Sequence, residues 1–201
     1  MNARAEPPAE RPVLTLPRAE AAWVAEEYAR ATTILEYGSG GSTAMAAEMA
    51  GKHVFAVESD PDWLAGMERW FAQNPPRADV TLHFADIGKV KEWGWPVDAR
   101  SWKKFPGYAL SVWDRADFSH PDLVLIDGRF RCGCLLTTLF RITRPIRVLF
   151  DDYLSRPRYS EVEDFVRPVE TRGRMARFDL APTAVPAERL AQILPMLSWP
   201  M

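Results

Sequence analysis

The sequence lacks the features of secreted and membrane-spanning proteins. Its two cysteines, Cys132 and Cys134, are separated by one residue and are poorly placed for a mutual disulfide within one helix. No apolar run approaches the roughly 20 residues that cross a bilayer. The opening run MNARAEPPAERP has none of the apolar centre of a secretory signal. We therefore expect a soluble, cytoplasmic protein that does not bind a membrane.

An excess of charge of one sign is also missing. The 25 basic and 27 acidic residues are mixed along the chain, the net charge is -2, and no polybasic run occurs. This composition predicts no nucleic-acid partner. The three histidines are scattered and no second cysteine pair exists, so the sequence predicts no zinc site either.

Alternating strand and helix patterns are the main feature that is present. Four prolines fall in the first 17 residues, so we expect an extended or disordered arm over 1–17 and one domain over 18–201. Helix-type runs separate the strand-type runs TTILEY, HVFAVE, VTLHFAD, DLVLID and RVLFDD, and a hairpin pattern surrounds Gly173. The predicted fold class is α/β: a doubly wound, mostly parallel, seven-stranded sheet with an antiparallel last strand.

The connection over 86–121 is rich in aromatic residues. These side chains either wall an apolar substrate pocket or pack the loop onto the sheet, and the sequence leaves both interpretations open.

A glycine-rich loop after the first predicted strand is the main functional motif. It runs over 38–42 as GSGGS, at the strand end where ligands gather in doubly wound sheets. Glu58 follows Gly38 by 20 positions and ends the second strand, which is the place of an acidic residue that binds ribose hydroxyls. Taken alone, the glycines fit a tight turn as well as a binding loop, and Glu58 fits a surface carboxylate as well as a ribose ligand. The two features together, at the expected spacing of about 20 residues, favour a nucleotide-type cofactor.

The residues around the loop distinguish between such cofactors. A dinucleotide fingerprint would place its third glycine at position 43, where this chain has Thr43, and no Gly-x-x-x-x-Gly-Lys phosphate loop occurs. Glu36 lies two residues before Gly38, so its carboxylate would repel a pyrophosphate and attract an ammonium group. S-adenosylmethionine carries both an ammonium and a sulfonium, which makes it the preferred candidate.

Four motifs, LEYGSGGST, FAVESD, HFADI and DLVLIDG, resemble those of the class I S-adenosylmethionine-dependent methyltransferases. The resemblance covers about Thr32 to Tyr153, and the WG-x-P and DGRFR stretches are similar to bacterial members without an assigned substrate. It implies a Rossmann-like fold, with Glu36, Gly38 and Gly40 at the methionine part of the donor. Glu58 would bind the ribose, and Asp86 with Ile87 the adenine. The full set of implied cofactor contacts is Glu36, Tyr37, Gly38, Ser39, Gly40, Ser42, Thr43, Glu58, Ser59, Asp86, Ile87 and Asp127.

Three carboxylates end the fourth and fifth predicted strands. Asp127 ends DLVLID, and Asp151 with Asp152 ends RVLFDD, so all three should converge beside the methyl donor. A divalent ion such as Mg2+ would offset their repulsion and could hold a hydroxylated substrate. The arrangement resembles the metal-dependent catechol-type O-methyltransferases. On this interpretation Asp127, Asp151 and Asp152 are the metal ligands.

Arginine offers the alternative to a metal. Arg129 and Arg131 flank Phe130, which stands where the catechol-type enzymes carry a lysine base. The two guanidinium groups either neutralise the three acids or bind an acidic group of the substrate. Without a metal, Asp127 or Asp151 is the predicted catalytic base toward a hydroxyl or an amine.

The sequence thus predicts an enzyme that transfers a methyl group from S-adenosylmethionine to a hydroxyl oxygen of a small molecule, and on the metal-binding interpretation Mg2+ assists this transfer. An NAD(P)-binding Rossmann enzyme and a catalytically silent nucleotide-binding module are the alternatives. Amide methylation of protein or nucleic acid is disfavoured, because no Asn/Asp-Pro-Pro-Tyr/Phe sequence follows the fourth strand. The acceptor and the oligomeric state stay open, with a homodimer among the alternatives.

Overall fold

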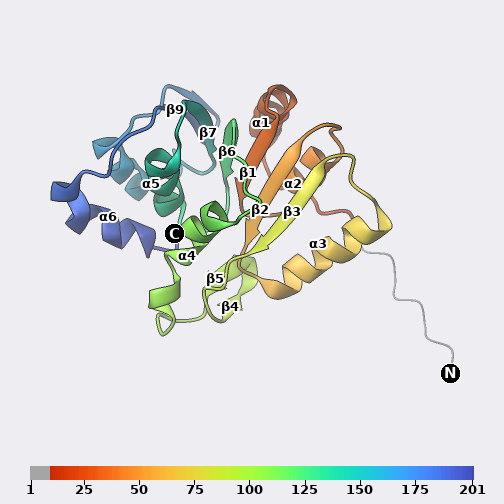
Figure 1. Ribbon diagram of the computed structural model, residues 1–201, viewed down its shortest axis with the longest axis horizontal. Helices are drawn as coiled ribbons and strands as arrows, with labels where there is room; N and C mark the ends of the chain where they lie inside the picture. The colour runs from red at the N-terminus through yellow and green to blue at the C-terminus, as the bar shows by residue number, and fades with distance from the viewer. Residues whose placement is uncertain (1–9) are drawn as a thin grey trace.

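Seven strands form one sheet at the centre of the structure, a computed structural model that describes residues 10–201. Their order across the sheet is β3, β2, β1, β6, β7, β9, β8 (Figure 1). The strands are β1 (Thr33–Tyr37), β2 (His53–Glu58), β3 (Asp79–Phe84), β6 (Leu123–Ile126), β7 (Ile146–Phe150), β8 (Glu170–Arg172) and β9 (Met175–Leu180). The first five in the sheet order run parallel, and β9 runs antiparallel to both of its neighbours. The predicted fold class is confirmed, and residues 1–9 of the predicted arm lie outside the described residues.

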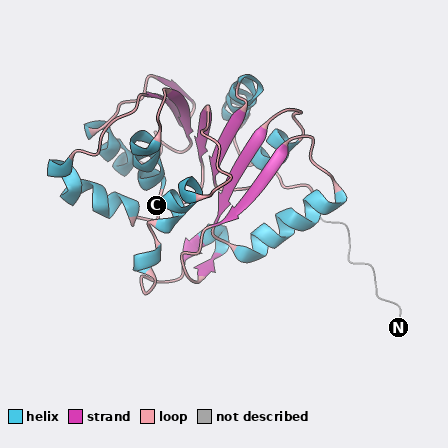
Figure 2. Cartoon of the chain, in the orientation of Figure 1, coloured by secondary structure: helices cyan, strands magenta, loops and turns pink. Residues whose placement is uncertain are grey.

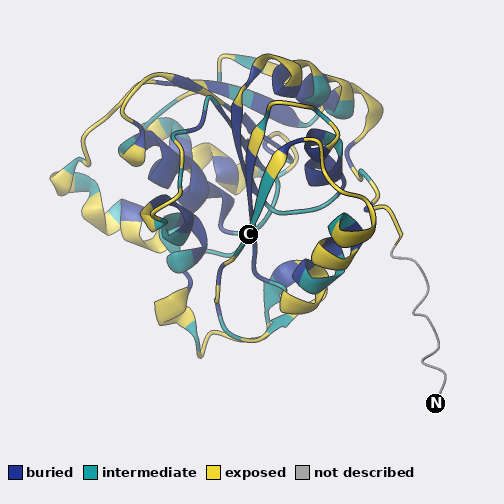
Figure 3. Cartoon of the chain, turned by 45° about the vertical axis from the view of Figure 1, so that its right-hand side comes forward, coloured by how far each residue is buried: buried dark blue, intermediate teal, exposed yellow. Residues whose placement is uncertain are grey.

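Helices cover both faces of this sheet (Figure 2). Side chains alternate along the central strands, so Leu35 and Val124 pack with α4, α5 and α6, whereas Ile34 and Leu123 pack with α1 and α2. The helices are α1 (Arg18–Arg30), α2 (Gly41–Ala47), α3 (Pro61–Gln73), α4 (Gly107–Leu110), α5 (Arg131–Arg141) and α6 (Leu190–Leu197). Figure 3 shows the resulting buried interior and the exposed outer sides of the helices. Within 10–201, no helix has the length and apolar character needed to span a membrane.

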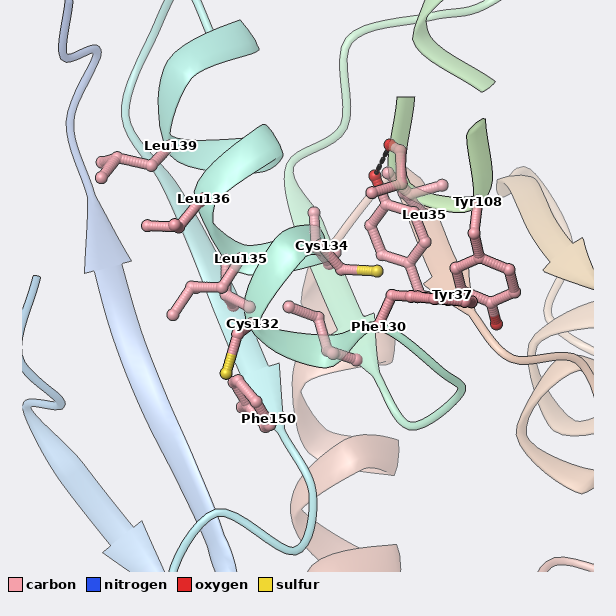
Figure 4. Packing of buried hydrophobic residues seen from close by; sticks show 14 of the residues in the cluster. Leu35, Tyr37, Tyr108, Phe130, Cys132, Cys134, Leu135, Leu136, Leu139 and Phe150 are labelled. Atoms are coloured by element: carbon pink, nitrogen blue, oxygen red, sulfur yellow. Dashed lines mark hydrogen bonds between the residues drawn. The ribbon is translucent and has the colours of Figure 1, made fainter. Parts of the chain in front are cut away.

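Both cysteines lie in the core on α5. Cys132 and Cys134 are buried beside the leucines of the same helix and the rings of Phe130 and Phe150 (Figure 4). Burial raises the pKa of Cys132 to about 12 and that of Cys134 well above its usual value. The two thiols are free, so they contribute to the structure through packing.

Local signals explain where the helices flanking the glycine loop begin. α3 starts at Pro61, because Oδ1 of Asp60 accepts hydrogen bonds from the next two free backbone amides, including that of Trp63 at 3.2 Å. α2 starts at Gly41, whereas the sequence pattern predicts it from Ala44. The difference arises because the amide of Ala44 donates a helical hydrogen bond to the carbonyl of Gly40 at 3.0 Å. The last residues of the glycine loop therefore form the first turn of α2.

The connection over 86–121 folds into short elements, and its aromatic residues divide between two roles. Phe105, Tyr108 and Trp113 are buried and pack the connection onto the sheet, while Trp93 and Trp102 are exposed. The elements are the paired strands β4 (Val90–Lys91) and β5 (Trp95–Pro96), the 3-10 helices η1 (Glu92–Gly94), η2 (Trp102–Lys104) and η3 (Ser111–Asp114), and α4. Two further 3-10 helices follow β7, namely η4 (Pro157–Asp164), where the pattern predicts an α-helix over 159–166, and η5 (Ala187–Arg189).

Candidate active site

A cavity of about 1030 Å³ opens at the carboxyl ends of the parallel strands. Its wall includes the loop 38–42 after β1, Glu58 at the end of β2, Asp127 after β6 and Asp152 after β7. Ligands of doubly wound folds bind where the strand order reverses, which is between β1 and β6 in this sheet. Ligand pockets measure roughly 300–1,000 Å³. The cavity therefore lies at the upper end of this range and is large enough for a nucleotide-type cofactor.

Two glycines bring the loops after β1 and β6 into contact. Gly38 has a φ of 103°, and a Cβ on it would lie 2.8 Å from Cα of Gly128. A Cβ on Gly128 would lie 2.1 Å from the hydroxyl oxygen of Tyr108 and 2.8 Å from the backbone nitrogen of Gly38. Gly40 differs, because a Cβ there would meet only Trp63, at 3.9 Å. The backbone at Gly40 therefore faces open space, and a ligand can approach it closely.

Glu58 presents its carboxylate at the edge of the cavity. Its Oε1 accepts hydrogen bonds from the amides of Ser59, at 2.6 Å, and Asp60, at 3.0 Å. Its Oε2 accepts from the amide and the hydroxyl of Ser39, at 3.4 and 3.2 Å. Burial raises the pKa of Glu58, and these donors oppose that shift. The carboxylate is thus held in place and can accept hydrogen bonds from ligand hydroxyls.

Glu36 lies beneath the glycine loop and does not line the cavity. Its side chain is fully buried and accepts hydrogen bonds from the hydroxyls of Tyr28 and Thr43. Thr43 also accepts from the amide of Gly40 at 2.9 Å, so Glu36 supports the loop through Thr43. Burial raises the pKa of Glu36 to about 7, against the effect of both hydroxyl donors. The carboxyl group is therefore partly protonated near neutral pH.

Five other residues that the resemblance implies for the cofactor also lie off the cavity wall, and the first of them is the buried Thr43 beneath the loop. Tyr37 is buried and its hydroxyl donates to a backbone carbonyl of α4 at 2.7 Å, and Ile87 is fully buried. Ser59 is buried, and its hydroxyl donates to a carbonyl of η1 at 3.4 Å. Asp86 is exposed and pairs with Nζ of Lys104 at 2.6 Å. Their contact with a cofactor stays a prediction, whereas Gly38, Ser39, Gly40, Ser42, Glu58 and Asp127 lie together on the cavity wall.

Arginine side chains separate the three carboxylates at the ends of β6 and β7. Arg174 binds Asp151 through two hydrogen bonds of 3.0 and 2.6 Å, and its Nε lies 3.1 Å from Asp152. Arg131 is buried and lies 3.1 Å from a carboxylate oxygen of Asp127 and 3.4 Å from one of Asp152. Each guanidinium thus bridges two carboxylates, and the two hydrogen bonds from Arg174 to Asp151 form the strong, bidentate kind of contact.

This arrangement does not support the predicted magnesium site. Arg131 and Arg174 provide the positive charge between Asp127, Asp151 and Asp152 that the sequence interpretation assigned to a divalent ion. In the part of the chain that the structure describes, no group of three His, Cys, Asp or Glu residues is set to hold a metal. The sequence did not indicate the role of Arg174, because this residue comes from the hairpin of β8 and β9, far along the sequence from the acids it neutralises.

The two predicted catalytic acids differ in their access to the cavity. Asp151 is fully buried behind Arg174 and does not line the cavity, whereas the side chain of Asp127 is 26% exposed and faces it. Burial raises the pKa of Asp127, the Arg131 guanidinium opposes this shift, and Asp151 reinforces it. A carboxyl group with a raised pKa in a cleft is a candidate proton acceptor.

A segment over 10–15, here called the strap, covers the glycine loop and lines the cavity. Gly41 makes this contact close, because a Cβ on it would lie 2.3 Å from the backbone nitrogen of Leu14. Arg11 anchors the strap through an ion pair of 3.0 Å with Glu48. The arm expected over 1–17 therefore lies, over these residues, against the candidate site.

Several other residues of the cavity wall were not found from the sequence. Nε1 of Trp63 donates a hydrogen bond to the carbonyl of Ser39 at 3.0 Å, and the Trp63 side chain is exposed. A large aromatic residue in the first turn of α3, next to the glycine loop, was the sequence feature that could have indicated this contact. Arg156 and Arg174 also line the cavity. They belong to no local motif, and only the fold brings them to the ends of β6 and β7.

Comparison with known proteins identifies the group to which the chain belongs. No family model matches it, and no curated protein matches it. A solved methyltransferase-like protein from Silicibacter pomeroyi is 47% identical, with a TM-score of 0.92 over 94% of this chain and 99% of that chain. The O-methyltransferase TomG from Streptomyces achromogenes is 15% identical, with a TM-score of 0.55 over 82% of this chain and 80% of that chain. A methyltransferase from Geobacter sulfurreducens is 12% identical, with a TM-score of 0.53 over 83% and 80% of the two chains.

The last two similarities show the fold alone, whereas the first extends over nearly the whole of both chains. The chain therefore belongs to the same methyltransferase-like family as the Silicibacter pomeroyi protein.

The buried carboxyl of Glu36 should make stability depend on pH. Because its pKa rises from 4.5 to about 7 on folding, the folded state binds the proton more tightly than the unfolded chain. The free energy of unfolding should therefore fall as the pH rises from 4.5 to about 7. Glu36→Gln should reduce this slope in urea unfolding measured across that range, while the exposed Glu68→Gln should not. An unchanged slope in Glu36→Gln would contradict the assignment.

A side chain at Gly41 should displace the strap. Gly41→Ala places a methyl group 2.3 Å from the backbone of Leu14, which cannot rotate away. We expect faster proteolysis within 10–17 and an affinity for S-adenosylhomocysteine that is about tenfold lower, equivalent to roughly 1.4 kcal/mol. Gly66→Ala is the matched control. Gly66 lines the same cavity, and a Cβ there would meet only the flexible end of the Arg69 side chain, at 3.9 Å. Equal proteolysis of both variants would show that the strap does not depend on this contact.

Proposed function

We propose that this chain methylates a hydroxyl oxygen of a small molecule, with S-adenosylmethionine as the donor and Asp127 as the base. The observation that carries the proposal is the joint placement of the loop 38–42, Glu58 and Asp127 on one cavity wall. The choice of donor is supported by TomG, an O-methyltransferase of the same fold that was solved with S-adenosylmethionine.

The ends of β1 and β2 form the donor half of the cavity. Gly40 leaves its backbone open to the cavity, so the methionine part of a donor can lie against it. Glu58 can accept hydrogen bonds from the two ribose hydroxyls, because each of its oxygens is anchored by backbone amides and faces the cavity edge. The strap covers this half and would exclude water from it.

The ends of β6 and β7 form the acceptor half. When bound, S-adenosylmethionine supplies a methyl group on a positively charged sulfur. A hydroxyl oxygen is a weak nucleophile while it keeps its proton, so a base must take that proton as the new oxygen–carbon bond forms. Asp127 faces the cavity, and Arg131 holds it at 3.1 Å without covering it. Its raised pKa gives the carboxylate the proton affinity that this role needs.

Binding of S-adenosylhomocysteine tests the donor half. Calorimetry should show a dissociation constant near 1 μM, or about -8 kcal/mol. Glu58→Ala removes charged hydrogen bonds to the ribose and should weaken binding tenfold or more, about 1.5–3 kcal/mol. The exposed Glu68→Ala on the neighbouring helix should bind as the wild type does. Tight binding of NADH without a signal from S-adenosylhomocysteine would overturn the proposal.

Methyl transfer from radiolabelled donor to a panel of small hydroxyl compounds tests the base. Asp127→Asn should lower kcat about 100-fold or more, and because the resemblance also places Asp127 at the cofactor, any loss of affinity for S-adenosylhomocysteine should be much smaller than the loss of kcat. Because the base acts in its ionised form, the wild-type kcat should fall as the pH drops below about 7. Asp117→Asn, which changes an exposed carboxylate outside the cavity, should retain the wild-type kcat. Full activity of Asp127→Asn would exclude this carboxylate as the base.

A further inference from the structure

The acceptor half of the cavity contains an arginine that pairs with none of its three carboxylates. Arg131 and Arg174 bridge the three acids, and Arg156 lies 3.3 Å from Asp152. The fourth arginine on this wall is Arg129. Over residues 10–201, no carboxylate lies within ion-pair distance of its guanidinium group. The acceptor half therefore carries a surplus positive charge at Arg129.

Neutral groups fix the guanidinium of Arg129 in one orientation. Its Nε donates to the carbonyl of Trp93 at 2.8 Å, and its Nη1 donates to the carbonyl of Gly128 at 3.2 Å. One face lies on the ring of Trp95, with Cζ 4.7 Å from the ring centroid. No acceptor for Nη2 occurs among the described residues, and the side chain lines the cavity. The group is thus positioned in advance and keeps a free donor.

Such an environment favours an anionic partner. Burial lowers the pKa of Arg129, and the neighbouring charges of Arg131 and Arg156 add to this effect. A bound anion would offset both costs, because a half-buried charge without a counter-ion is unfavourable. The planar guanidinium suits carboxylate and phosphate in particular, since its donors match two oxygens of either group.

We propose that the methyl acceptor carries a carboxylate or phosphate group that binds to Arg129. This inference rests on the proposed function and names the class of substrate, an anionic hydroxyl compound. Arg129 and Asp127 belong to the same short loop after β6 and line the same cavity. An acidic group on Arg129 would therefore place a nearby hydroxyl of the same molecule beside the base, so Arg129 sets the orientation as well as the charge of the acceptor.

Inorganic phosphate tests the anion site without any need for turnover. Added to protein saturated with S-adenosylhomocysteine, at matched ionic strength, millimolar phosphate should raise the Tm of the wild type more than that of Arg129→Gln. Arg100→Gln should respond as the wild type does, because Arg100 is exposed, pairs with Asp98 and lies outside the cavity. Equal responses of the wild type and Arg129→Gln, or none in either, would overturn the proposal.

Matched acceptor pairs test the role of Arg129 in the reaction. Each pair consists of a hydroxy acid and the amide of the same acid, for example 4-hydroxybenzoate and 4-hydroxybenzamide. Over a panel of such pairs, the wild type should favour the acids about tenfold or more in kcat/KM, and Arg129→Gln should lose that preference mainly through KM. Equal use of acids and amides by the wild type would contradict the proposal.

A third measurement separates the acceptor from the donor as the source of the anion. S-adenosylhomocysteine has a carboxylate, and methylthioadenosine lacks the whole amino-acid part, so both are titrated against the wild type and Arg129→Gln. We expect no change in either affinity. Selective loss of S-adenosylhomocysteine binding would assign Arg129 to the donor carboxylate and overturn the proposal. Phosphate binding at Arg129 with no methyl transfer to any compound would instead refute the proposed reaction and leave the anion site intact.

Discussion

The contact between Gly38 and Gly128 determines how the two halves of the site face each other. At this point the sheet order reverses, because β1 leads to β2 on one side while β6 leads to β7 on the other. Neither position has room for a side chain, since each Cβ would approach the opposite backbone to 2.8 Å. Glu58 and Asp127 thereby line the same cavity. Methyl transfer needs its two partners in contact, so wider spacing of these loops would reduce the rate steeply.

The charge balance of the acceptor half depends on segments far apart in the chain. Arg174, which binds the buried Asp151, follows the turn at Gly173, where a φ of 57° favours glycine. The buried carboxylate of Glu20, on the first helix, accepts a hydrogen bond from the amide of Arg174 at 2.8 Å. Loss of one partner from a buried pair costs about 3–5 kcal/mol. The first helix and the last hairpin thus stabilise the same end of β7 that borders the acceptor.

The sequence predicted what local patterns determine. Strands such as LVLI in β6 are short apolar runs buried on both faces, and the glycine loop with Glu58 at its fixed spacing indicated residues that the fold brings to one cavity wall. It could not show that Arg174 reaches Asp151, because that pairing depends on the register of β9 against β7. The sequence interpretation therefore assigned to Mg2+ a charge that Arg174 and Arg131 supply in the structure. The sequence also did not predict that the strap lies on the glycine loop. Its prolines indicate an extended chain, but they do not indicate what that chain contacts.

The burial of Cys132 and Cys134 has a consequence for how the core moves. The thiolate is the form that reacts with alkylating reagents and oxidants, and the raised pKa of both groups keeps them protonated at neutral pH. Modification of either thiol therefore requires that α5 first separate from the sheet. Under conditions where reclosing is faster than the chemical step, the labelling rate reports the equilibrium between the packed and opened forms of this helix. Two natural cysteines thus provide a built-in probe of local unfolding directly behind the loop that carries Asp127.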